Sequence, residues 1–185
     1  MKKFIALLLS LIMCFGLTAC SQDSPSDALK ADLENAKANP EELAEGMDEG
    51  FGEEAGKAFV EKMLDFEYEL GEEKVDGDTA TVKATIKTYP FGEIFTQVLT
   101  DYITQALADP NLSEDEINSL MDSLMLEALK KAEKSYETTV DVSLKKGDDG
   151  WEVQEDDKLA NALTGGIYDL ANTMAGGFED LEDIE

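Results

Sequence analysis

The chain has 185 residues, of which 42 are acidic, 15 are lysines and none is arginine or histidine, so its formal net charge is −27. Such a charge repels a nucleic-acid backbone, and the lack of arginine removes bidentate recognition of phosphate. The lack of histidine excludes Ser-His-Asp and Cys-His nucleophiles and histidine-ligated zinc. We therefore predict no nucleic-acid partner and no bound cofactor, and the sequence names no catalytic or metal-binding residue.

The chain begins with Met1, Lys2 and Lys3, and an uncharged apolar run then extends to Ala19. This order is typical of a secretory signal peptide, and the run is shorter than the roughly 20 apolar residues of a transmembrane helix. The run ends in Leu17-Thr18-Ala19-Cys20, which resembles the lipobox of bacterial lipoproteins. The resemblance implies that residues 1–19 are removed and that the thiol of Cys20 carries a diacylglyceryl group. The alternative is an ordinary signal peptide with a coincidental cysteine.

Removal of residues 1–19 leaves 166 residues with a charge of about −29 and, because Cys14 is lost, without a disulfide partner for Cys20. We expect a lipidated linker at 20–26, a single domain at 27–175 and a disordered acidic tail at 176–185. Two acyl chains on Cys20 are sufficient for stable anchoring. The expected location is the outer face of the bacterial cytoplasmic membrane, with the domain held away from anionic lipid by its own charge.

Two helical segments come first in the predicted domain. Apolar residues at helical spacing and a serine or aspartate cap predict a helix from Ser26 to Asn39, which Pro40 ends. A second helical stretch runs from Glu41 to Leu64, with an apolar residue every fourth position. Its four glycines weaken it. They favour close backbone packing or a break between two short helices over a hinge beside a ligand.

The spacing of apolar residues then changes to alternation, which predicts a β-hairpin. One strand covers Leu64 to Leu70 and the other covers Ala80 to Lys87. A three-residue loop, Val75-Asp76-Gly77, places the apolar residues of both strands on one face, with Leu70 opposite Val82 and Tyr68 opposite Ala84.

Helical spacing returns in the middle of the chain and predicts a helical hairpin. A broad apolar face runs from Phe95 to Leu107, and Ser113-Glu-Asp-Glu116 is a capping box for a helix that continues to Ala132. A second β-hairpin follows, in which a four-residue loop places Leu144 opposite Trp151 and Val142 opposite Val153. The last helix begins near Leu159 and is interrupted at Gly165-Gly166. The order predicts an α+β fold: an antiparallel sheet of two hairpins packed on helices, with an inserted helical hairpin and a C-terminal helix.

Several stretches resemble uncharacterised lipoproteins of Gram-positive bacteria, which form families named only as domains of unknown function. The resemblance rests on the lipobox, on the late strand Gly150-Trp151-Glu152-Val153, and on the stretches Phe66–Leu70, Phe95–Tyr102 and Ala162–Gly166. It covers most of the mature chain, and its motifs are structural. It implies a fold related to the cystatin-like fold of nuclear transport factor two, although the helical hairpin departs from the minimal version of that fold. It assigns no functional residue to any position.

Patterns that carry chemistry are few. Ser143-Leu-Lys-Lys146 matches a Ser-x-x-Lys nucleophile motif, but it lies on a predicted strand, whereas the motif needs the start of a helix. Paired carboxylates for glycoside hydrolysis stay open, because 42 acidic residues always contain a suitable pair. The loop from Asp109 to Leu120 lacks the glycine and the final glutamate of an EF-hand. Weak calcium binding by Asp148-Asp149 or Asp156-Asp157 also stays open. Trp151 is expected in the core and not in a pocket.

The sequence therefore predicts an extracytoplasmic lipoprotein that acts as a non-enzymatic binding module of the cell envelope. Its partners would be the membrane, through the lipid on Cys20, and an envelope protein or small-molecule ligand. The alternative is a carboxylate-dependent hydrolase or isomerase-like enzyme, with an acid of raised pKa in a pocket between sheet and helices.

Overall fold

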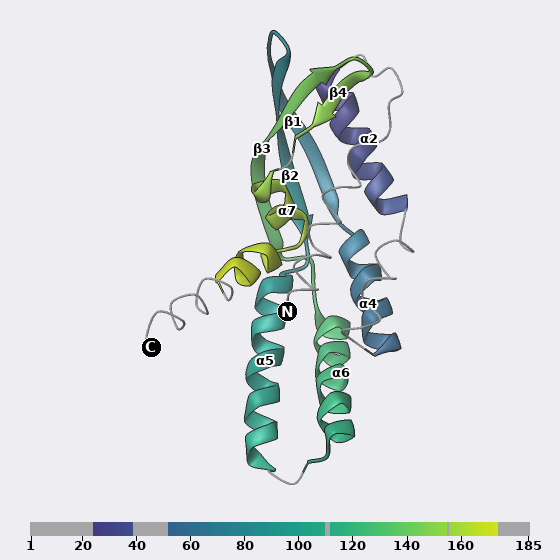
Figure 1. Ribbon diagram of the computed structural model, residues 1–185, viewed down its shortest axis with the longest axis vertical. Coiled ribbons are helices and arrows are strands. Elements are labelled where there is room, and N and C mark those ends of the chain that lie inside the picture. The colour runs from purple at the N-terminus through teal and green to yellow at the C-terminus, as the bar shows by residue number, and fades with distance from the viewer. Residues whose placement is uncertain (1–23, 39–51, 110–111, 155, 174–185) are drawn as a thin grey trace.

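The computed structural model describes residues 24–38, 52–109, 112–154 and 156–173 (Figure 1). It contains the helices α2 (Pro25–Ala38), α4 (Glu53–Leu64), α5 (Phe91–Ala108), α6 (Glu114–Lys131) and α7 (Asp157–Leu163), and the strands β1 (Glu67–Asp76), β2 (Thr79–Thr88), β3 (Tyr136–Gly147) and β4 (Gly150–Val153). Residues 167–173 are also helical. The proposed signal peptide, Cys20, the residues 41–51 of the second helical stretch and the acidic tail lie outside the described residues.

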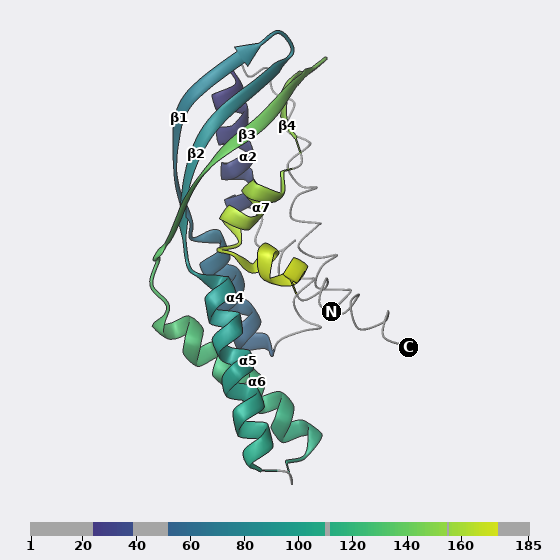
Figure 2. The ribbon, with the colours of Figure 1, turned by 90° about the vertical axis from the view of Figure 1, so that its left-hand side faces the viewer.

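The four strands form one antiparallel sheet in the order β1-β2-β3-β4. From Ala80 to Thr88 the side chains of β2 alternate between buried and half-buried positions, as a strand with one covered face requires. Helices α2 and α7 lie on the covered face, and no described helix lies on the other (Figure 2). The helical pair α5–α6 leaves the end of β2, returns at the start of β3 and projects away from the sheet (Figure 1).

The first hairpin has a different register from the predicted one. Its loop is Gly77-Asp78, so Asp76 pairs with Thr79, and a bulge between Leu70 and Glu73 inserts one residue into β1. Gly77 has φ 61°, at the position where a type II′ turn takes glycine. The extra residue that the sequence placed in the turn lies in the strand instead. The error is an even shift, so each side chain keeps its predicted face: Tyr68 lies opposite Ile86 and Leu70 opposite Ala84.

The register of the second hairpin was also wrong by two residues. Strand β3 continues through Gly147, which pairs with Gly150 around a two-residue loop. Leu144 therefore lies opposite Val153 and not opposite Trp151, which pairs with Lys146. Gly150 has φ 131°, which lets the turn close where a side chain would be strained. Trp151 still lies on the predicted face, where it is half-buried against the core.

The interior is divided into two hydrophobic cores. The first fills the space between the sheet and its two covering helices, with Leu29 and Leu33 of α2 against Val82 and Ile86 of β2. The second lies among α4, α5 and α6, where the ring of Phe59 makes edge-to-face contacts with Phe91 and Phe95 at 5.1 and 5.6 Å between centroids. The sequence predicted one domain but did not indicate that its core has two parts.

Two glycine-containing segments join these parts through backbone contact. After α7 the chain turns at Gly165 and Gly166, which have φ values of 53° and 88°. The amide of Gly92, in the first turn of α5, donates a hydrogen bond to the carbonyl of Gly165 at 2.9 Å. A Cβ atom on Gly165 would lie 1.9 Å from the carbonyl oxygen of Tyr89. Glycine is therefore required by contact as well as by conformation.

The α+β class, the antiparallel sheet of two hairpins, the inserted helical hairpin and the C-terminal helix with its break at Gly165-Gly166 are confirmed. The capping box is confirmed too: the Oγ atom of Ser113 accepts from the amide of Glu116, and the amide of Ser113 donates to the Glu116 carboxylate at 2.9 Å. The cystatin-like arrangement stays a prediction. Among the described helices, none has the length and hydropathy needed to cross a bilayer.

Candidate functional site

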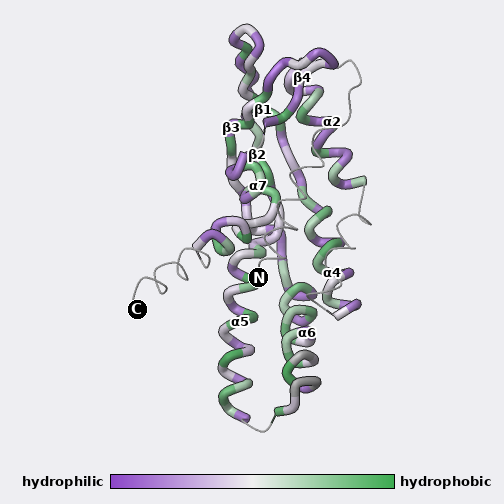
Figure 3. Tube along the Cα trace, in the orientation of Figure 1, coloured by the Kyte–Doolittle hydropathy of each residue, from purple (hydrophilic) through white to green (hydrophobic). Residues whose placement is uncertain are grey.

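The distal half of the α5–α6 hairpin is the most exposed apolar part of the described structure. Between Leu99 and Leu124 no described residue is buried, although hydrophobic residues continue to the end of the hairpin (Figure 3). Helix α4 reaches α6 at Asp122, whose carboxylate accepts a hydrogen bond from the amide of Gly52 at 2.7 Å. Ile103 and Leu107, which are 54% and 78% exposed, are two of the three exposed large hydrophobic residues in the described chain. Exposed apolar surface of this kind marks interaction sites.

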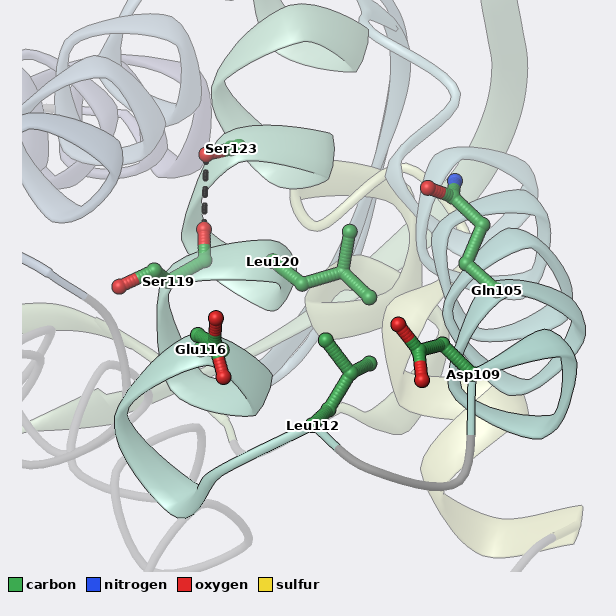
Figure 4. A pocket seen from close by; sticks show the side chains of 7 residues that line it. All are labelled: Gln105, Asp109, Leu112, Glu116, Ser119, Leu120 and Ser123. Atoms are coloured by element: carbon green, nitrogen blue, oxygen red, sulfur yellow. Dashed lines mark hydrogen bonds between the residues drawn. The ribbon is translucent and has the colours of Figure 1, made fainter.

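A cleft of about 520 Å³ opens between the end of α5 and the start of α6. Figure 4 shows Leu112 and Leu120 between the two helices, facing Asp109, with Glu116 and Ser119 beside them on α6. The remaining lining residues are Gln105 and Ser123. The described lining thus combines an apolar floor with two carboxylates, an amide and two hydroxyls, and it contains no cationic side chain. Such a lining suits a ligand that carries hydrogen-bond donors or a positive charge.

The charge of Glu116 is stabilised where it lies. Its carboxylate accepts hydrogen bonds from the amide and the Oγ of Ser113, at 2.9 and 2.7 Å. These bonds hold the pKa of Glu116 below its usual range. The carboxyl group is therefore ionised at neutral pH and suited to attract a cation. A general acid would need the opposite shift.

A second polar cluster joins the two cores and was not predicted. The ammonium group of Lys134, only 19% of whose side chain is exposed, lies 2.8 Å from Asp65 and 3.1 Å from Glu67. The hydroxyl of Tyr89 donates to the other oxygen of Asp65 at 2.9 Å. The ammonium of Lys62 lies 4.0 Å from the centre of the Tyr89 ring. These residues come from the ends of α4, β2 and α6 and from the start of β1. The cluster therefore connects the sheet to the three helices α4, α5 and α6, which we call the helical arm.

The electrostatics of this cluster are those of a structural ion pair. The hydrogen bond from Lys134 lowers the pKa of Asp65, against the opposing effect of burial. The same bond raises the pKa of Lys134, and burial followed by the Asp65 hydrogen bond raises that of Tyr89. Since Asp65 and Lys134 are each shifted towards their charged forms, neither is suited to exchange a proton near neutral pH.

Replacing Lys134 with methionine is expected to lower the free energy of unfolding at pH 7 by about 1–2 kcal/mol, between the values for exposed and buried pairs because both acids are more than half exposed. The folded pKa of Asp65 lies below 3.8, so its contribution is present above that pH and is lost as pH falls through the lowered value. The contribution of Lys134 to stability is lost only above pH 10.5, because its pKa is raised. The difference from wild type, measured by urea unfolding, should therefore shrink from pH 7 towards pH 3.

The control is Lys131→Met, which removes a pair with Glu127 at 2.6 Å between side chains that are 73% and 63% exposed. This change should cost at most about 0.5 kcal/mol. Equal effects of the two substitutions at pH 7, or an effect of Lys134→Met that does not depend on pH, would show that the cluster contributes no more than a surface pair.

The other candidate residues named from the sequence lie at positions where their role is structural. Ser143 and Lys146 lie on β3 near the second turn, as expected for a coincidental match to the nucleophile motif. The Lys146 ammonium lies 5.8 Å from the centre of the Trp151 ring. Within the described ranges, no group of three or more acidic, cysteine or histidine residues is arranged to hold a metal ion. Cys20, the proposed lipid attachment site, lies outside those ranges.

The sequence identified some residues of the cleft and of the Lys134 cluster, but not their functions there. It found Glu116 as a helix cap but not as a wall of a cleft, because Gln105 and Asp109 reach the cleft only when the two helices pair. It missed Lys134, which lies 69 residues from its partner Asp65. The one signal for the uncovered helix was in the sequence: α5 contains only two charged residues, Glu93 and Asp101, in a chain that is 31% charged.

Comparisons with known proteins agree with the expected family type. No curated protein is significantly similar to the chain. One solved structure, that of a candidate lipoprotein, YcdA, from Bacillus subtilis, matches 84% of the chain at 20% identity with a TM-score of 0.45. The chain spans about half of that protein, or 54% of its length. The family model described as domain of unknown function DUF5105 matches residues 67–168, from the start of β1 into the last helical segment. Since this match covers more than half of the sequence, the chain belongs to the DUF5105 family.

Proposed function

We propose that this chain is a lipid-anchored, non-enzymatic binding module on the outer face of the bacterial cytoplasmic membrane. The N-terminal pattern supports the anchor: two lysines, an apolar run and Leu17-Thr18-Ala19-Cys20. The expected mature chain has no second cysteine, so a thioether-linked lipid is the simplest role for Cys20.

The contact element of the module is the distal half of the α5–α6 hairpin. The observation that carries this assignment is that the described hairpin has no buried side chain between Leu99 and Leu124, while its end holds the cleft between Asp109 and Glu116. A ligand with an ammonium or guanidinium group and a short apolar stem fits this lining, because Leu112 and Leu120 can contact the stem while the carboxylates bind the charge. A basic side chain of an envelope protein meets this description.

The enzymatic alternative lacks a supporting observation. A carboxylate acid catalyst at neutral pH needs a raised pKa. Five described carboxyl groups have a lowered pKa instead: Glu53, Asp65, Glu116, Glu127 and Asp141. The lining of the cleft therefore supports binding better than proton transfer.

The anchor is tested at Cys20. In the membrane fraction of a bacterium that produces the whole chain, we expect a mature N-terminus at residue 20 with the mass of a diacylglyceryl group. The substitution Cys20→Ser should abolish both the lipid and the cleavage, because serine has no thiol to alkylate. A soluble wild-type protein, or an unmodified Cys20 in an intact Ala19-Cys20 bond, would refute the anchor without affecting the assignment of the hairpin.

The cleft is tested with a small cationic probe, N-acetyl-lysine methylamide, titrated into the mature chain and followed by amide chemical shifts. We expect shifts around Glu116 and Ser119, and a dissociation constant that Glu116→Gln raises by about two- to fivefold, as for a solvent-screened pair. Glutamine preserves the capping box, so the helix should stay intact. The matched control, Glu69→Gln on the uncovered face of the sheet, makes the same charge change elsewhere. Equal weakening by both variants would mean that the probe binds only to the general negative charge.

A further inference from the structure

Helix α2 is fixed to the sheet at both of its ends. At its start, the amide and the hydroxyl of Ser26 donate to the carboxylate of Glu73 on β1, with 2.9 Å for the amide. Near its end, the ammonium of Lys37 lies 4.6 Å from the centre of the Phe66 ring. Between these contacts the apolar side of α2 packs in the first core. Helix α2 is therefore part of the folded body, and any tether that precedes it ends at Ser24.

The start of α2 and the α5–α6 hairpin lie at opposite ends of the sheet. Glu73 comes shortly before the turn at Gly77-Asp78, and the turn between β3 and β4 lies at the same end (Figure 1). We call this the turn end of the sheet. At the other end Thr88, the last residue of β2, pairs with Tyr136, the first of β3. The α5–α6 hairpin is inserted between these two strands, and both views show it continuing away from the turn end (Figures 1 and 2).

The described molecule is long in this direction. Strand β2 has 10 residues, or about 33 Å of strand. Helix α5 has 18 residues, or about 27 Å of helix. The tip of the hairpin therefore lies about 50–60 Å from the start of α2.

The linker to the expected lipid is short compared with this length. Ser24 is the first described residue, and Cys20 lies four residues before it. A chain spans at most about 3.6 Å per residue, so four residues reach about 14 Å. We propose that the turn end faces the bilayer and that the α5–α6 hairpin points away from it. The cleft between Asp109 and Glu116 is then held about 50–60 Å outward from the anchored end. This orientation rests on the proposed lipid on Cys20.

The distribution of charge favours this upright orientation over one in which the molecule lies flat. Between Leu99 and Leu124 the hairpin has six acidic residues and no lysine. The six are Asp101, Asp109, Glu114, Asp115, Glu116 and Asp122. The turn end carries exposed lysines among its acids, at Lys74, Lys145 and Lys146. An anionic lipid surface repels a nearby acidic segment within a screening length of about 8 Å. Because the linker holds one end, this repulsion turns the hairpin outward.

The orientation restricts the kind of partner that the cleft can take. A cationic group at the lipid headgroups of the same membrane would lie too far from the cleft to reach it. The partner is therefore a molecule of the envelope whose ammonium or guanidinium group stands about 50–60 Å above the bilayer. The outer domain of another envelope protein meets this description.

The orientation is tested by energy transfer from a single fluorescent label to acceptor lipids. The lipidated chain has no free thiol, so a maleimide dye labels only an introduced cysteine. The lipidated variants Val75→Cys and Leu107→Cys carry the label beside the turn end and near the tip of the hairpin, at side chains that are 54% and 78% exposed. In vesicles of equal parts phosphatidylglycerol and phosphatidylcholine with a headgroup acceptor, we expect several-fold more transfer from Val75→Cys. The control Ile103→Cys, at a side chain that is also 54% exposed, should transfer less than Val75→Cys as well.

A longer linker gives the second readout. A Gly/Ser insertion of about 20 residues after Gln22 forms a flexible coil, so it should lower the transfer from Val75→Cys by releasing the turn end from the surface. Equal transfer from Val75→Cys and Leu107→Cys in protein that floats with the vesicles, or no effect of the insertion, would overturn the orientation and leave the anchor intact. A chain that carries no lipid and does not float would instead refute the anchor, and the orientation with it.

Discussion

Replacing Gly165 with alanine is expected to lower the free energy of unfolding by about 2–4 kcal/mol. Two effects add. Gly165 has φ 53°, a left-handed conformation that costs other residues about 1 kcal/mol. In addition, the new Cβ would lie 1.9 Å from the carbonyl oxygen of Tyr89 and 3.0 Å from the amide nitrogen of Phe91. Neither is the end of a flexible side chain, so the backbone must move, which costs about 1–3 kcal/mol.

Gly77→Ala separates these two effects. Gly77 has φ 61°, and nothing lies within 4 Å of its added Cβ, so only the conformational cost of about 1 kcal/mol applies. Urea unfolding of the two variants beside wild type measures the difference directly. Equal losses would mean that the contact between the Gly165 turn and the start of α5 yields without cost, and that this turn does not hold the arm on the sheet.

Replacing Phe59 with alanine is expected to cost about 3–5 kcal/mol and to loosen the helical arm before the sheet. The side chain is 1% exposed and lies at the centre of the second core, between Phe91 and Phe95 of α5. The core between α2 and the sheet shares none of these contacts. Hydrogen exchange should therefore show greater loss of protection in α5 and α6 than in β2 and β3.

The reciprocal variant is Leu29→Ala, which creates a cavity in the first core, where Leu29 is fully buried. It should cost about 2–5 kcal/mol and reduce protection mainly in α2 and the sheet. If both variants reduce protection equally throughout, the two cores unfold as one cooperative unit, and the Lys134 cluster and the Gly165 turn couple them more tightly than the packing suggests.

The exposure of the distal half of the α5–α6 hairpin has a consequence for the test of the cleft. Because Glu116 is exposed and glutamine preserves its capping box, Glu116→Gln should change binding with little change in stability. The effect of this variant on binding can therefore be interpreted as a change of the surface alone. By contrast, substitutions at Phe59 or Gly165 act on the support of the arm and would affect every surface on it.

The sequence by itself determined what depends on neighbours along the chain. Apolar spacing identified the helices and strands and the face that each one buries, since a side chain's direction follows from its position in a helix or strand. The capping box at Ser113 and Glu116 was readable because its partners are three residues apart. The pattern around Cys20 is likewise contiguous, so the expectation of an anchor needs no fold.

The tertiary structure alone decided what depends on distant segments meeting. Both hairpin registers were off by two residues because an even shift leaves every side chain on its face, so the hydrophobic pattern cannot distinguish the alternatives. The division into two cores, the approach of Gly165 to Tyr89 and the bond between Lys134 and Asp65 all join positions far apart in the chain. The low charge of α5 could be read directly from the sequence. That its outer face stays uncovered in the described structure depends on where α4 and α6 pack.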